Sequence, residues 1–181
     1  MLKSRWTKCV ASAAALGACL LLLASPAAAQ TTASASIDAT ASVIGNTPID
    51  ATGEQPLNFG AVLAGTAVLV DPATQASQTG LFRVTGEPSA PISVNFGLPT
   101  ELTGPGDPIT INFAGTDGLE WSAYPTAYTT FDPHVAYNTA ITGAGDLFVG
   151  IAGNITVGSG PGVISGVYTG TIVLDVAYIG T

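Results

Sequence analysis

The chain carries its hydrophobic side chains at every second position over two long stretches. In residues 33–43, one set of alternating positions is entirely apolar and the other is polar; in residues 166–178, the same period recurs with β-branched and aromatic side chains. A period of two places successive side chains on opposite faces, so both stretches are predicted to be strands with one buried face. The apolar faces comprise Ala33, Ala35, Ile37, Ala39, Ala41 and Val43 in the first stretch, and Tyr168, Ile172, Leu174, Val176 and Tyr178 in the second.

The second stretch raises the main functional question. Only three residues follow it, so we expect no later segment of this sequence to cover its far edge. A long apolar strand at a sheet edge is a template for pairing with another chain unless something shields it. The sequence therefore directs attention to what lies beside residues 166–178.

Between these two stretches, short apolar runs alternate with turn residues, and no helical period of useful length occurs after residue 30. We expect residues 114–132 to be the least regular part. These features predict a single all-β domain, a β-sandwich. The predicted strands lie at 56–70 with a kink, 81–85, 91–96, 109–113, 135–141, and 147–157 with breaks near Gly150 and Gly153.

The first residues have the pattern of an export signal. A basic segment at 3–8 precedes an apolar run at 9–24, and small residues at 26–29 supply a cleavage site. This is typical of a secretory signal peptide. We therefore expect residues 1–29 to be removed and residues 30–181 to form one domain in the periplasm, at the cell surface or outside the cell.

Export would leave a strongly acidic chain without cysteine. Both cysteines lie in the signal, and lipoprotein-type cleavage at Cys19 is the weaker interpretation because the apolar run continues directly after it. Of the four basic residues only Arg83 remains, against twelve acidic ones. This charge argues against nucleic acid and anionic lipid as partners. Without a second apolar span, we expect no transmembrane segment in the mature chain.

The mature sequence lacks the residue sets that most catalytic and metal sites require. His134 is its only histidine, and no Gly-x-Ser-x-Gly motif accompanies it. Zinc sites need several His or Cys ligands, and Asp117 with Glu120 falls short of a calcium loop. We therefore predict a non-enzymatic protein with no cofactor and no metal.

The aromatic-rich segment 121–137 offers a candidate ligand surface. Trp121, Tyr124 and Tyr128 could stack on sugar rings, although such residues more often cover the end of a small β core. We favour the packing role. The alternative is a self-complete secreted domain that binds glycans or another surface partner through this segment.

Four motifs occur in order along the chain: Pro-Leu-Asn-Phe-Gly at 56–60, then 82–88, 149–157 and 166–178. Together they resemble a family of proteobacterial secreted proteins whose domain has no assigned function. The Leu-Asn-Phe-Gly element and the final Gly-x-Tyr strand are also similar to spore coat protein U and archaic chaperone–usher pilins. The resemblance covers most of residues 33–179.

The resemblance to pilins implies an incomplete immunoglobulin-like sandwich, whose last strand borders a groove that a neighbour's N-terminal strand fills. Carried to this sequence, residues 166–178 would be the groove strand and 33–43 the donor strand. Identical or related subunits and a periplasmic chaperone would be the partners. Our leading hypothesis is therefore an exported, pilin-like structural or surface-assembly subunit.

The donor face itself leaves a second arrangement open. Only Ile37 and Val43 are large. Burial of each would stabilise a complex by roughly 1.5–3 kcal/mol, against ~0.8 kcal/mol for an alanine methyl. Four alanines make a shallow plug, so residues 33–43 could instead pair within their own chain and complete a monomeric sandwich.

Overall fold

The computed structural model describes Asp38 and residues 47–180, and in this part of the chain every regular element is a β-strand. The expected signal peptide lies outside the described residues. So does the candidate donor strand 33–43, apart from Asp38, which is exposed. Among the described residues, no helix has the length and apolar character needed to cross a membrane.

All strand pairs are antiparallel, and they form three sheets. The largest sheet has the order β1 (Asp50–Gln55), β3 (Gly80–Thr85), β10 (Asp146–Ile151), β7 (Gly118–Ala123) and β8 (Ala127–Phe131). A three-stranded sheet has the order β12 (Val173–Tyr178), β4 (Pro91–Gly97) and β9 (Tyr137–Ala140). A four-stranded sheet has the order β2 (Ala67–Val70), β11 (Gly153–Thr156), β6 (Ile109–Asn112) and β5 (Glu101–Leu102).

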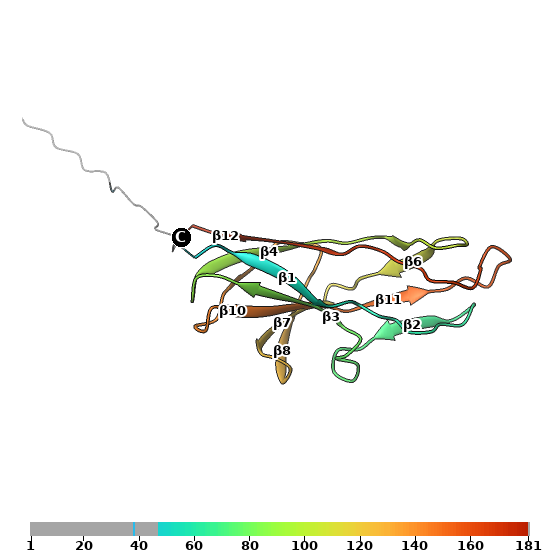
Figure 1. Ribbon diagram of the computed structural model, residues 1–181, viewed down its shortest axis with the longest axis horizontal. Helices are drawn as coiled ribbons and strands as arrows, with labels where there is room; N and C mark the ends of the chain where they lie inside the picture. Colours follow the sequence, from blue (N-terminus) through green and yellow to red (C-terminus); the bar gives the residue numbers. More distant parts are fainter. Residues whose placement is uncertain (1–37, 39–46, 181) are drawn as a thin grey trace, which may run out of the picture. The chain divides into compact units, whose positions relative to one another are not determined.

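The five-stranded and three-stranded sheets pack face to face as a β-sandwich (Figure 1). Val84 and Val149 of the first sheet meet Ile92 of the second in a fully buried core. Phe131 and Tyr137 close the side at β8 and β9, with their rings stacked at a centroid distance of 4.0 Å. The opposite side lies between the edge strands β1 and β12.

A second core adjoins the first, because the chain passes directly from a strand of the five-stranded sheet into a strand of the four-stranded sheet. β10 leads through Ala152 directly into β11 of the four-stranded sheet. Here Ile109, Ile111, Ile155 and Val157 form a buried cluster. An isolated bridge between Thr103 and Thr169 then joins the β5 side of this sheet to the segment that leads into β12.

Alternating patterns were reliable where one face of a strand is buried. The strands predicted at 81–85, 91–96 and 109–113 are confirmed as β3, β4 and β6, and Ile92 and Val94 point into the core as expected. Of the breaks predicted near Gly150 and Gly153, the second is confirmed at Ala152, whereas the strand continues through Gly150.

Three strand predictions were wrong in their extent. No strand begins at residue 56; β1 lies upstream at 50–55, where almost every residue is exposed and pairing with β3 replaces side-chain burial. The segment 114–132 is not irregular, because it contains the β7–β8 hairpin. In 166–178 the continuous strand starts only at Val173, although the alternating burial persists through the last six residues.

Candidate partner-binding groove

An open groove of about 610 Å³ lies between two segments that are far apart in the sequence. One wall comes from residues 56–64, which connect β1 to β2. The other comes from residues 163–172, which precede β12. The two wall segments lie at the end of the sandwich where the four-stranded sheet lies (Figure 1), beyond the edges of β1 and β12.

The floor of the groove is the surface of the second core. Ile109, Ile111, Ile155 and Val157 line it and are only 3–8% exposed. Leu57, Phe59 and Tyr168 are partly buried in the walls and pack against the same cluster. An apolar floor between two walls suits an extended chain whose alternate side chains point inward.

The two walls do not pair with each other. Among the described residues, no backbone hydrogen bond joins 56–64 to 163–172. Thr169 exchanges both of its backbone bonds with Thr103, at 2.8 and 2.9 Å. Among the described residues, no backbone–backbone hydrogen bond of Tyr168 or Gly170 is found, and in an extended segment their N–H and C=O groups point away from the side that Thr169 turns to Thr103. These groups are available to an added strand.

The groove does not extend along the whole of β12. The Cα atoms of β1 and β12 come within 8 Å of each other. Strands lie about 4.8 Å apart, so a strand inserted between two others would hold them about 9.6 Å apart. Where β1 and β12 come this close they meet in a seam that leaves no room for a strand, and the lining of the groove ends before β12, at Ile172.

The predicted groove-strand residues consequently divide into two groups. Tyr168 and Ile172 line the groove. Leu174, Val176 and Tyr178 do not line it; they pack against the core of the sandwich beneath the seam. The alternation placed all five on the inner face, but only the first two lie where a partner could reach them.

Tyr178 fixes the point at which the N-terminal part of the chain enters the domain. Its hydroxyl accepts a hydrogen bond from the Glu87 backbone N–H at 2.7 Å and donates one to the Thr47 carbonyl at 2.9 Å. The Thr47 hydroxyl also donates to the Glu87 carboxylate at 2.6 Å. We call Thr47, Glu87 and Tyr178 the base anchor. It lies at the C-terminal end of β12, away from the groove.

Replacing Tyr178 by phenylalanine should lower the free energy of unfolding by about 1–3 kcal/mol, because the Glu87 N–H and the Thr47 carbonyl both lose their partner. Chemical denaturation in dilute solution measures this loss. Tyr124→Phe is the matched control, since the exposed Tyr124 hydroxyl makes no such contacts and its removal should change stability by less than about 0.5 kcal/mol. Equal stability of the two variants would show that the base anchor is not formed.

The candidate ligand residues form a packed row on the outer face of the largest sheet. Trp121 pairs with Phe148 on one side and with Tyr128 on the other. Its indole is 3% exposed and lies over Gly150, where a side chain would collide with it. Tyr124 packs edge-on against Trp121 at 5.5 Å and stacks on Phe148 at 5.2 Å. Trp121 therefore packs inside this cluster, and Tyr124, 38% exposed, presents the more accessible ring.

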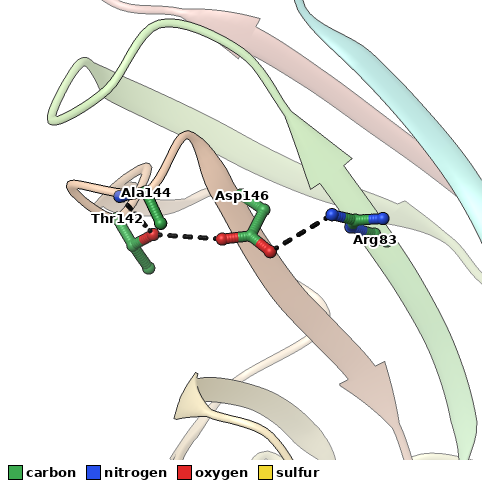
Figure 2. Close-up of polar contacts among 4 residues, drawn as sticks. All are labelled: Arg83, Thr142, Ala144 and Asp146. Atoms are coloured by element: carbon green, nitrogen blue, oxygen red, sulfur yellow. Dashed lines mark hydrogen bonds and ion pairs between the residues drawn. The ribbon is translucent and has the colours of Figure 1, made fainter.

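Arg83 lies beside this row and is already paired. Its Nη2 is 3.4 Å from Asp146 Oδ2, and its guanidinium carbon is 5.8 Å from the centre of the Phe148 ring. The Thr142 hydroxyl donates to Asp146 and accepts from the Ala144 N–H (Figure 2). Such exposed pairs contribute about 0–1 kcal/mol, so this network mainly holds the turn before β10.

The remaining polar contacts are explained by local structure. Asp132 Oδ1 accepts from the His134 backbone N–H and lies 2.8 Å from His134 Nδ1, and these contacts, the backbone bond first, lower the pKa of Asp132. Burial, and then a hydrogen bond to Glu120, raise the pKa of Tyr137. In the described part of the chain, no three His, Cys, Asp or Glu residues are grouped so that they could hold a metal ion.

Sequence reasoning missed most of the groove. The floor residues were predicted only as parts of strands, and 56–64 was expected to be a strand rather than a wall. The Leu-Asn-Phe-Gly motif was the one signal available, since Leu57 and Phe59 both face the groove. No family model, curated protein or solved structure matches this chain.

Proposed function

We propose that this protein is an exported, pilin-like structural subunit whose groove accepts residues 33–43 of a second copy as an added strand. The observation that carries the proposal is that the two walls, 56–64 and 163–172, share no backbone hydrogen bond and stand above a floor of buried Ile and Val side chains. An open sheet edge beside such a floor favours strand addition over binding of a compact solute.

The sequence of residues 33–43 matches this groove in pattern. Its apolar face would lie on the floor, with Ile37 and Val43 as the two large side chains. Its polar face would remain in water, and its backbone would bond to the free groups of Tyr168 and Gly170. A periplasmic chaperone would occupy the same groove before assembly.

A second copy is a better source of this strand than the same chain. The base anchor holds Thr47 beside Tyr178, and the groove begins only at Ile172. A chain that folded back on itself would first have to pass the seam between β1 and β12 before it reached Ile172. No strand fits between β1 and β12 where they meet, so those residues would be excluded from the seam.

The proposal is tested by removing the donor segment. Residues 30–181 should form polymers by light scattering, and the same protein without residues 30–44 should remain a folded monomer that binds an added 31–43 peptide. A peptide of the same composition with its alternation scrambled is the control and should not bind. A parent protein that is a stable monomer, and that unfolds on truncation, would show that the segment pairs within its own chain.

A further inference from the structure

We infer that the end of the domain around the groove packs against the opposite end of the next copy, so that neighbouring subunits touch through their folded bodies as well as through the donor strand. This inference rests on the proposed function. It concerns two surfaces. The tip rim is Leu63, Ile164 and Val167; the base is Thr47, Pro48, Pro88, Ser89 and Ala144.

The tip rim is an apolar surface that the domain itself leaves open. Leu63 is 77% exposed, Val167 79% and Ile164 50%. The chain neighbours of Leu63 line one wall of the groove, and Ile164 and Val167 line the other. The loop that carries Ile164 is held in place, because the Tyr168 hydroxyl donates to the Ile164 carbonyl at 2.9 Å. The rim is therefore ordered before any partner binds.

The tether between donor strand and domain is too short to keep two bodies apart. Only residues 44–46 separate Val43 from Thr47, so their Cα atoms can be about 14 Å apart at most. Thr47 is fixed to Tyr178 and Glu87 by the base anchor. A copy whose residue 43 occupies the groove must therefore bring its base close to the groove end where that residue sits.

The direction of the donor strand decides which end this is. If Val43 lay near Ile172, the incoming base would overlap the seam of β1 and β12 on the acceptor. If Val43 lies at the other end, the base meets the tip rim, beyond which the domain ends in turns (Figure 1). Each copy then has its tip and its own base anchor at opposite ends, which allows the contact to repeat head to tail.

The chemistry of the two surfaces agrees. The base presents Pro48, Pro88, Ser89 and Ala144, all exposed and uncharged. Arg83 is the one basic residue of the described chain, and it is paired with Asp146. In this part of the chain, no unpaired basic residue is therefore left to attract an acidic surface of the next copy. Apolar contact between the tip rim and the base is the remaining source of attraction.

The test compares two properties of the mature chain: assembly, followed by sedimentation, and binding of a labelled 31–43 peptide, followed by fluorescence anisotropy at concentrations below assembly. Leu63→Ser should weaken assembly by about tenfold or more, since this side chain is 77% exposed, does not line the groove and would lose its burial at the contact. Peptide affinity should stay within about twofold. Val135→Ser is the matched control, because Val135 is 59% exposed but lies in the β8–β9 connection, away from the tip.

Three results would overturn the inference, and they are distinguishable. A Leu63→Ser protein that assembles like the parent would show that the bodies do not pack at this surface, while leaving the groove proposal intact. A loss of peptide binding equal to the loss of assembly would show that Leu63 acts on the groove rather than at a body contact. A parent that neither assembles nor binds the peptide would overturn this inference and the proposed function together.

Discussion

Replacing Ile37 by aspartate should lower the affinity of the 31–43 peptide for the groove by more than about 100-fold. The substitution removes one of the two large donor side chains, worth roughly 1.5–3 kcal/mol, and directs a carboxylate onto a floor of buried Ile and Val side chains. A charge without a partner in such surroundings costs several kcal/mol. Titration of labelled peptides into the donor-deleted protein gives both affinities directly.

Ser36→Asp is the control for this prediction. It adds the same charge one residue away, on the face that is predicted to remain in water, and should change the affinity by less than about threefold. The comparison matters because the acceptor is acidic and repels any added negative charge. Equal losses of affinity for the two peptides would mean that the groove does not distinguish the apolar face of the donor from its polar face. Strand addition in the proposed form would then be wrong.

Replacing Trp121 by alanine should lower the free energy of unfolding by about 3–5 kcal/mol, the usual cost of emptying a buried aromatic position. The indole fills the space over Gly150 and is enclosed by Tyr124 and Tyr128. Chemical denaturation measures the effect. Tyr124→Ala is the control: it belongs to the same cluster but is 38% exposed, so its removal should cost about 1 kcal/mol.

The same variant separates packing from ligand binding. If Trp121→Ala kept its stability but lost retention on a glycan array that retains the parent, the aromatic row would be a sugar-binding surface after all. A destabilised variant, with no glycan retained by the parent, would leave the row as the cover of the outer face of the sheet.

The alternation of apolar and polar residues was sufficient to predict the all-β class and the faces of the core strands. β4 shows this most clearly, since Ile92 and Val94 are fully buried as their spacing requires. In β12 the pattern also gave the correct inner face, with Leu174, Val176 and Tyr178 on it. Such predictions succeed because side-chain direction in a strand depends only on position parity.

Of two strands that were not predicted, β1 has no alternating pattern, whereas β7 has one. β1 is exposed along nearly its whole length, so backbone pairing with β3 holds it and its side chains carry no period. In β7 both faces are occupied: Leu119 and Trp121 pack outside, and Glu120 reaches Tyr137 on the inside. The β7 sequence does alternate, with apolar Leu119 and Trp121 on either side of Glu120, so the hairpin was missed although its period of two was present.

Taken alone, then, the sequence determined that the chain forms β-strands, which side of each half-buried strand is apolar, and that residues 33–43 have the pattern of a strand. Only the tertiary structure decided that β1 and β12 meet in a seam, that the open floor lies between 56–64 and 163–172, and that Tyr178 ties the chain entry to the opposite end. The physical reason is that side-chain parity is a local property of the backbone, whereas the distance between two sheet edges depends on every strand packed between them.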